Sequence, residues 1–132
     1  MPDTKKALHD KAAAYAKAWS SGDPQAVAGF YASDGRIAIN RGDPIVGRAA
    51  IADMAAGFHA EYPDLVVHCD SFRLAGDHAL FAWTLEGTHS RTGKRAKLPG
   101  WEEWTLNPAG EVAASLGWYD AAEYDRQVEE GA

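Results

Sequence analysis

The stretch Leu98-Pro99-Gly100-Trp101-Glu102-Glu103-Trp104-Thr105-Leu106 sets two glutamates side by side in a run that alternates like a β-strand. Because successive side chains of a strand point to opposite faces of a sheet, one glutamate has to point to each face. The even-numbered residues from Ala96 to Leu106 are apolar or small except for Glu102, whereas the odd-numbered ones are mixed. The alternation predicts that Glu102 is buried; a register shift of one residue would bury Glu103 instead.

A glutamate buried against tryptophan is unusual enough to mark a candidate functional site. Removal from water disfavours the charged form of a carboxyl and raises its pKa, and carboxyls with a shifted pKa gather at functional sites. The ordinary alternative is a core glutamate whose carboxyl is satisfied by Ser115, by a tyrosine hydroxyl or by a helix terminus.

The rest of the chain reads as helices followed by strands, which predicts an α+β domain with the helices on one side of an antiparallel sheet. Asp23 is expected to cap a short helix that starts at Pro24 and carries Val27, Phe30 and Tyr31. Asp120 is expected to cap the last helix. Helices are expected over about 4–20, 49–60 and 121–130, and strands over about 36–40, 65–74, 78–89, 94–106 and 111–119.

Composition excludes several classes of function. The 132 residues carry a formal charge of −6, which argues against a nucleic-acid surface, and no apolar stretch approaches the roughly 20 residues of a membrane helix. A cytoplasmic protein is expected. Cys69, the single cysteine, has no partner for a disulfide. No metal site is expected, because His68, His78 and His89 lack chelating spacing, and no cofactor is expected, because there is no glycine-rich phosphate loop.

The two hairpin turns of the second half predict which residues share the face of Glu102. With Thr92-Gly93 at the centre of one turn, Trp83 lies opposite Glu102; with Pro108-Ala109 at the centre of the next, Ser115 does. Large aromatic side chains around a few polar groups are typical of a small-molecule pocket. The face is expected to hold Phe81, Trp83, His89, Glu102, Trp104, Ser115 and Tyr119.

Several short motifs, in order, resemble a known superfamily. The first half, which contains Tyr15, Gly22-Asp23, 30–34 and 46–51, resembles nuclear transport factor 2-like domains, including ketosteroid isomerases. The second half is similar to the SnoaL-like polyketide cyclase branch, in the motifs 62–65, 76–77, 87–89, 100–104 and 118–120. The resemblance covers almost the entire chain, as a single domain over residues 1–132. It implies a cone-shaped domain whose curved sheet wraps around about three N-terminal helices and encloses a hydrophobic cavity, commonly as a homodimer through the outer face of the sheet.

The resemblance also implies roles for individual residues. Tyr15 matches the tyrosine that donates to the oxyanion in ketosteroid isomerases, Glu102 matches the protonated aspartic acid beside it, and Tyr31 matches a further tyrosine. The general base of those isomerases is not matched, because Ile39 occupies its position. The histidine that cyclases often carry on the last strand is replaced by Ser115.

These features predict a cofactor-independent isomerase or cyclase for a hydrophobic, carbonyl-bearing substrate, in which Tyr15 and neutral Glu102 stabilise an enolate and His89 is the base. An ionised Glu102 that acts as base, or activates water as in a hydrolase, is an alternative. A non-catalytic ligand-binding or dimerisation domain is another. The residues expected to bind the substrate are Trp19, Tyr31, Phe58, Trp83, Trp104, Ser115 and Tyr119.

Overall fold

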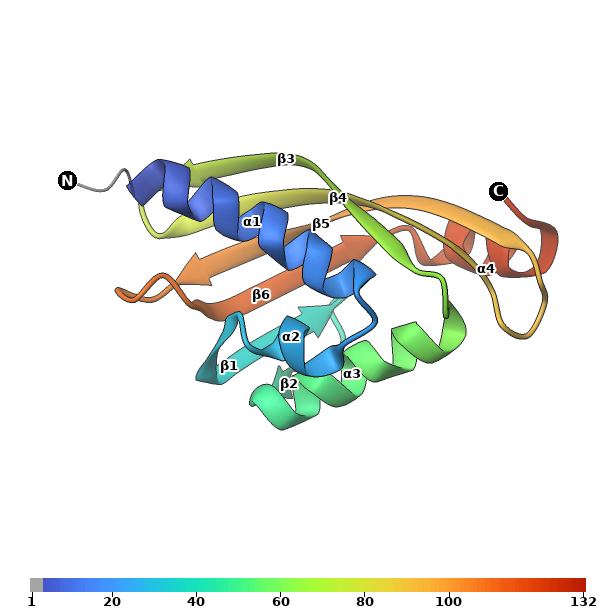
Figure 1. Ribbon diagram of the computed structural model, residues 1–132, viewed down its shortest axis with the longest axis horizontal. Coiled ribbons are helices and arrows are strands. Elements are labelled where there is room, and N and C mark those ends of the chain that lie inside the picture. The colour runs from blue at the N-terminus through green and yellow to red at the C-terminus, as the bar shows by residue number, and fades with distance from the viewer. Residues whose placement is uncertain (1–3) are drawn as a thin grey trace.

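The computed structural model describes residues 4–132 and contains four helices and six strands within that range (Figure 1). Two helices, two strands and a third helix make up the first half of the chain, and four long strands follow before the last helix. In chain order they are α1 (Thr4–Ser20), α2 (Pro24–Ala28), β1 (Tyr31–Ile39), β2 (Ile45–Val46), α3 (Arg48–Glu61), β3 (Val66–Ala75), β4 (His78–Thr88), β5 (Arg95–Leu106), β6 (Val112–Tyr119) and α4 (Ala121–Glu130).

The strands form one sheet in the order β2-β1-β6-β5-β4-β3. The neighbours β3 to β6 are antiparallel and are joined by tight turns, as expected for a meander. By contrast, β1 runs parallel to β6, because the chain between them passes through α3 and the three strands that follow it. The sheet is therefore mixed, with β1 and β6 as its parallel pair.

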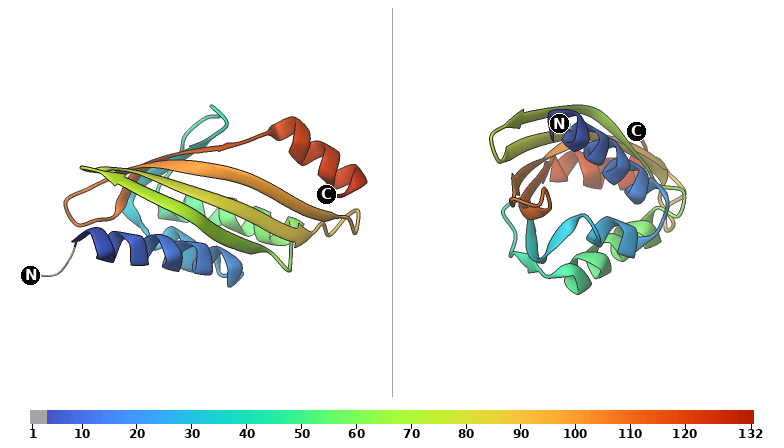
Figure 2. Two further views of the ribbon diagram at one scale, coloured as in Figure 1. Left: turned by 90° about the horizontal axis from the view of Figure 1, so that it is seen from above. Right: turned by 60° about the vertical axis from the view of Figure 1, so that its left-hand side comes forward.

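The helices α1, α2 and α3 cover one face of the curved sheet, and α4 lies at the end of the sheet opposite the start of α1 (Figure 2). The core lies between the three helices and the sheet. It contains Tyr15 and Trp19 of α1 and Ile51 of α3, together with the even-numbered residues of β5, so the predicted alternation of that strand is confirmed. This α+β architecture, with a curved sheet around N-terminal helices, is the one predicted.

The predicted pairing of the long strands was wrong by two residues in both hairpins. Glu102 lies opposite Phe81 in β4, not Trp83, and opposite Gly117 in β6, not Ser115. In the first hairpin the turn closes one residue earlier than predicted, with the Gly93 N–H donating to the carbonyl of His89. In the second, an irregularity between Thr105 and Leu106 shifts the register. A shift of two residues keeps every side chain on its predicted face.

The first strand also differs from the prediction. The helix capped by Asp23 ends at Ala28, so Tyr31 belongs to β1, which begins five residues before the expected strand. A tight turn at Phe30, whose amide donates to the Val27 carbonyl, makes this early change of direction possible. The other cap is confirmed, since the Asp120 carboxylate accepts from the Glu123 amide at the start of α4.

No helix of residues 4–132 is long and apolar enough to cross a bilayer. The basic turn between β4 and β5 is engaged with nearby acids: Arg91 pairs with Glu129 at 2.7 Å, and Arg95 pairs with Asp64 at 3.2 Å.

Candidate functional site

Glu102 lies in the middle of β5 with its side chain on the face that the helices cover. It is 6% exposed, and it is one of four polar or charged residues that are buried in the described chain. Its neighbours in the sheet are Phe81 and Gly117, which offer no polar side chain. The carboxyl therefore depends on partners from farther along β5 and β6 and from α1 and β1.

One carboxyl oxygen of Glu102 collects nearly all of these partners. Oε1 accepts from the Ser115 hydroxyl at 2.8 Å and from the Trp104 indole N–H at 3.0 Å. The hydroxyls of Tyr15 and Tyr31 lie 3.1 and 3.2 Å from the same oxygen. The other oxygen, Oε2, has a single contact, with Tyr15 at 3.1 Å.

The two tyrosine hydroxyls cannot both donate to the carboxyl and also to each other. They lie 2.8 Å apart, and each carries one proton, so one of those protons is spent on the bond between them. Trp104, Ser115 and one tyrosine are left as donors to Glu102. With Oε1 saturated by this network, Oε2 is the oxygen through which Glu102 can meet a ligand.

Burial and hydrogen bonding act on the pKa of Glu102 in opposite directions. Burial raises the pKa above its ordinary value of 4.5, because an ionised carboxylate loses its hydration, and the hydrogen bonds from Trp104, Ser115, Tyr15 and Tyr31 lower it. Burial is the larger effect, so the pKa is raised. The pKa values of Tyr15 and Tyr31 are also raised, by burial first and then by the nearby carboxyl, so both phenols stay protonated.

Glu102 borders an apolar cavity of about 70 Å³ between the sheet and the helices. Because Ile37 and Ile39 of β1 and Met54 of α3 line it, one side of the cavity is aliphatic. Among its lining residues, which all belong to the described part of the chain, Glu102 is the sole carboxyl. The others are Trp19, Phe58, Val67, Phe81, Trp83, Leu85, Leu98, Gly117, Trp118, Tyr119 and Tyr124.

Gly100 on β5 leaves no open space beside it. A Cβ on Gly100 would collide with the ring of Trp83, so the indole occupies the space beside the glycine. A Cβ on Gly117 would meet its neighbours only at ordinary contact distances, 3.7 Å from Ile39 and 3.9 Å from Glu102. The open space therefore lies along Gly117 and Ile39.

The structure brings most of the predicted site residues together, in two layers. Glu102, Trp19, Phe58, Trp83 and Tyr119 line the cavity. Tyr15, Tyr31, Trp104 and Ser115 contact the Glu102 carboxyl but do not line the cavity, and all four are nearly or fully buried. This second group positions the carboxyl and does not form the wall.

His89 is the predicted residue that the structure leaves apart from Glu102. It is buried against the ring of Tyr62 at the turn after β4, and it does not line the cavity. Its Nδ1 accepts from the Arg91 amide at 3.1 Å, which leaves the proton of the neutral ring on Nε2, 3.6 Å from a Glu61 carboxylate oxygen.

Several residues of the cavity wall were not predicted from the sequence, and Ile39 and Tyr124 are two of them. Ile39 was noted only as the replacement for a base, although it borders the cavity, and Tyr124 was not considered. Tyr124 follows Tyr119 by five residues across the start of α4, and the spacing alone gives no reason to place both rings in one wall. Their rings lie 5.6 Å apart. In residues 4–132 no three His, Cys, Asp or Glu side chains are grouped so as to hold a metal ion.

Solved structures of several proteins are similar in fold to the whole chain. A putative polyketide cyclase from Xanthomonas campestris is 22% identical, with a TM-score of 0.79 over 94% of this chain and 96% of that one. A putative SnoaL-like polyketide cyclase from Jannaschia is 13% identical, with a TM-score of 0.80 over 100% and 99%. The epoxide hydrolase/cyclase-like enzyme SalBIII, which has a role in pyran ring formation in the polyether salinomycin, is 17% identical, with a TM-score of 0.80 over 91% and 95%.

At these identities the likeness shows a common fold and no more. No curated protein sequence matches the chain. The family model of the SnoaL-like domain matches residues 12–114, which include the helix of Tyr15, the strand of Glu102 and most of the cavity wall. The chain therefore belongs to the SnoaL-like family, within the nuclear transport factor 2-like superfamily.

Proposed function

We propose that the protein is a cofactor-independent enzyme of isomerase or cyclase type, in which Glu102 is the acid for a small, hydrophobic, carbonyl-bearing substrate. One observation carries the proposal: among the described residues Glu102 is the sole carboxyl in the cavity wall, and its Oε2 has one hydrogen-bonding contact, with Tyr15, where Oε1 has four. A carbonyl oxygen seated in the apolar cavity would accept the hydrogen bond of protonated Oε2.

The surroundings of Glu102 suit an acid better than a permanent carboxylate. Its pKa is raised by burial, and an apolar ligand that displaces water from the cavity would disfavour the charged form further. As negative charge develops on the carbonyl oxygen of an enolising ligand, the Oε2 proton moves toward it. Donors aimed at developing charge in a dry site are usually the largest electrostatic contribution to catalysis.

The hydrogen bonds to Oε1 stabilise the carboxylate that this proton transfer leaves. When Glu102 gives up its proton, the carboxylate that remains accepts from Ser115, from Trp104 and from one tyrosine. Tyr15 thus acts through Glu102 and does not touch the substrate, unlike the direct donor that the family resemblance implied.

His89 has no part in this proposal, because it is turned toward Glu61 at the end of β4. The proton that leaves the substrate carbon passes to water at the cavity mouth. Because water is a weak base, the rate acceleration should be small. The substrate must therefore have a C–H group that is already acidic, next to its carbonyl.

Hydrogen–deuterium exchange at the α carbon of 2-tetralone tests this chemistry. In D₂O the wild-type protein should accelerate exchange above the buffer rate, and Glu102→Gln should lose on the order of 100-fold of that acceleration, the usual cost of one lost donor of this kind. Mass spectrometry of the recovered ketone measures the rate.

Glu103→Gln is the matched control, because it makes the same change on the next residue, whose side chain lies on the opposite face and bonds the Trp118 indole. It should exchange 2-tetralone as the wild type does. Equal exchange rates in the wild type and in Glu102→Gln would refute the role of Glu102 as the acid. A wild-type exchange rate no faster than that of buffer alone would refute it as well.

A binding domain without turnover is the second candidate function. It is favoured by a specific observation, namely that no base faces Glu102 across the cavity, whose remaining wall is aromatic and aliphatic. In that case 2-tetralone would bind, Glu102→Gln would weaken its binding, and no exchange would be accelerated.

We also propose that two copies of the chain pair through the outer face of the sheet. Leu80, Trp101 and Leu116 are 37%, 42% and 47% exposed on this face, and a shallow groove of about 720 Å³ crosses it beside Glu103. Large apolar side chains left exposed on one face, here with Glu103 between Leu80 and Leu116, are a feature of interaction sites. Light scattering should give a dimer for the wild type and a monomer for Leu116→Glu; a monomeric wild type would contradict pairing.

A further inference from the structure

The cavity has a second polar end, formed by two tyrosines that no step of the proposed reaction uses. Tyr119 is the last residue of β6 and Tyr124 lies in the first half of α4, and both line the cavity. Tyr119 packs against Trp83 with ring centroids 6.5 Å apart. Apart from the indoles and Glu102, these two phenols are the polar side chains of the described cavity wall.

The hydroxyl of Tyr124 is held in place and still has capacity for a ligand. It donates to Glu61 Oε2 at 3.1 Å, and the same carboxylate lies near His89 through its other oxygen. Since the single proton of Tyr124 is directed to Glu61, the two lone pairs of its oxygen remain as acceptors, with Tyr62 as a neighbour. Burial and the neighbouring Tyr62 and Glu61 raise the pKa of Tyr124, so it stays a neutral phenol.

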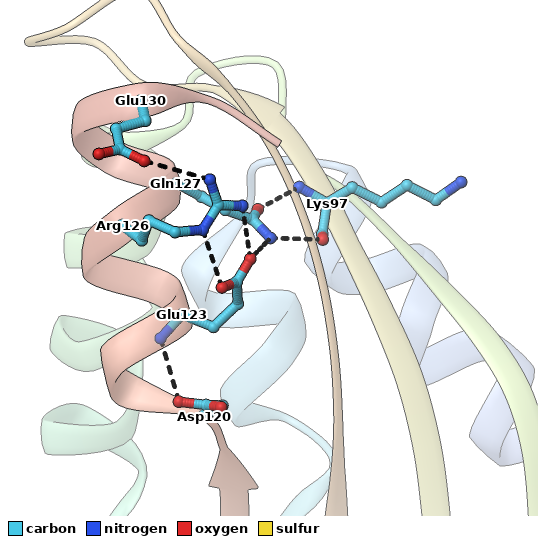
Figure 3. Close-up of polar contacts among 6 residues, drawn as sticks. All are labelled: Lys97, Asp120, Glu123, Arg126, Gln127 and Glu130. Atoms are coloured by element: carbon cyan, nitrogen blue, oxygen red, sulfur yellow. Dashed lines mark hydrogen bonds and ion pairs between the residues drawn. The ribbon is translucent and has the colours of Figure 1, made fainter.

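The helix that carries Tyr124 is fixed to the sheet by more than this contact. The side-chain amide of Gln127 bonds both backbone groups of Lys97, accepting from its N–H at 2.7 Å and donating to its carbonyl at 3.0 Å (Figure 3). Glu123 accepts from Gln127 and Arg126, and Asp120 caps the helix. Tyr124 is therefore a preorganised part of the wall.

The two polar ends are separated along the sheet. Glu102 lies beside Gly117, and Tyr119 is two residues farther along β6, so the two levels are about 7 Å apart. Tyr124 packs against Tyr119 and bonds Glu61, whose side chain is 45% exposed. The tyrosine end of the cavity is therefore the end toward solvent, and Glu102 is the inner end.

We propose that Tyr124, with Tyr119 beside it, binds a hydroxyl group on the outer end of an elongated apolar ketone whose carbonyl meets Glu102. This inference rests on the proposed function, because it names the substrate class of the same cavity. The inner end offers a proton and selects an acceptor. The outer end offers the Tyr124 oxygen and selects a hydrogen-bond donor. A hydroxy-ketone with its carbonyl at Glu102 should therefore bind better than the same molecule bound in the reverse orientation, and better than a ketone without a hydroxyl.

A matched pair of ketones tests the inference: 2-tetralone and 6-hydroxy-2-tetralone, whose hydroxyl lies at the end away from the carbonyl. Dissociation constants can be measured by isothermal titration calorimetry on the full chain. The hydroxy-ketone should bind the wild type about tenfold more tightly than 2-tetralone. Tyr124→Phe should remove most of that advantage and leave the affinity for 2-tetralone unchanged.

Tyr62→Phe is the control, because Tyr62 packs against Tyr124 with ring centroids 6.3 Å apart but does not line the cavity. It should leave both affinities unchanged. If Tyr124→Phe is poorly folded, Tyr119→Phe provides a second variant with the same expected selective loss.

The outcomes separate this inference from the proposed function. If 2-tetralone binds and depends on Glu102 but the hydroxy-ketone gains nothing, or if Tyr124→Phe weakens both ketones alike, the second recognition site is refuted alone. If neither ketone binds the wild type, the proposed function fails and the inference fails with it.

Discussion

Among the single residues, Glu102 is decisive, because the way its carboxyl is satisfied determines what the site can do. An isolated buried carboxylate is very unfavourable, whereas a protonated or hydrogen-bonded carboxyl is tolerated. Here Trp104 and Ser115 donate to one oxygen, while the second oxygen has a single described contact, with Tyr15. The burial of Glu102 could be predicted because it needs only the two-residue period of a strand. The asymmetry between its two oxygens could not, because it depends on the positions of side chains from four elements.

Tyr62 belongs to a motif that carries the family resemblance, but no role was predicted for it. It is fully buried, yet its hydroxyl makes no hydrogen bond within the described structure, while Tyr124 beside it bonds Glu61. An unsatisfied buried hydroxyl costs about 1–3 kcal/mol.

Tyr62→Phe should therefore leave the free energy of unfolding unchanged or raise it by up to about 1 kcal/mol, because it removes an unpartnered polar atom and keeps the ring. Chemical denaturation measures this. Tyr31→Phe, which removes a hydroxyl that is bonded to Tyr15, is the contrasting variant and should destabilise the protein. A loss of more than about 1 kcal/mol in Tyr62→Phe would mean that its hydroxyl has a partner.

For the helices and strands, the sequence predicted which face of the sheet a side chain occupies better than it predicted which residues pair across the strands. The alternation along β5 assigned its side chains to the correct faces, while the pairing was wrong by two residues in both hairpins. Register depends on where a turn closes and where a strand is irregular, and neither is marked by hydrophobic period. The early start of β1 escaped prediction because Tyr31 continues the helical spacing of Val27 and Phe30.

Gly35 is the residue that lets β1 pass close to β6. A Cβ at this position would lie 2.8 Å from the carbonyl oxygen of Val112 and 2.9 Å from that of Ala32, and both are backbone atoms that cannot give way cheaply. Its neighbourhood is where the register between β1 and β6 shifts.

Gly35→Ala should lower the melting temperature, with a loss of about 1–3 kcal/mol of unfolding free energy from overpacking. The control is Gly57→Ala in α3, where a new Cβ meets nothing within 4 Å. This variant should gain about 0.5–1 kcal/mol from the higher helix propensity of alanine. Equal effects of the two substitutions would show that close packing of β1 on β6 does not matter.

At the scale of the whole molecule, the curved sheet and three helices form a scaffold that leaves one apolar cavity with an acid at its inner end. The resemblance of short motifs indicated this scaffold correctly, and the family match and similar structures confirm it. Which residues line the cavity was only partly predicted. Tyr124 comes from the last helix and enters the wall because Gln127 holds that helix on β5.

The dependence of global stability on pH should carry the signature of Glu102. Its pKa in the folded protein is raised above 4.5, so the folded state holds this proton more tightly than the unfolded state does. The contribution of protonated Glu102 to stability is complete below about pH 4.5 and is lost as the pH rises through the folded pKa.

The free energy of unfolding of the wild type, minus that of Glu102→Gln, should therefore fall as the pH rises from 4.5, by at most about 1.4 kcal/mol per pH unit, and then level off. Urea denaturation at a series of pH values gives this difference. Hydrogen bonds from Arg126 and Gln127 lower the pKa of Glu123 to about 2, so its contribution to stability changes with pH in the opposite sense. This contribution is the same in both proteins and therefore cancels in the difference. A difference that rises above pH 4.5 would contradict the raised pKa.

The most direct test of the central claim is a titration of the Glu102 carboxyl by NMR in protein labelled with ¹³C-glutamate, with Glu102→Gln to assign the resonance. The midpoint should lie above 4.5 in the free protein and should rise further when 2-tetralone fills the cavity. A midpoint at or below 4.5 that does not move with the ketone would mean that Glu102 is an ordinary carboxylate, and the proposed acid would be refuted.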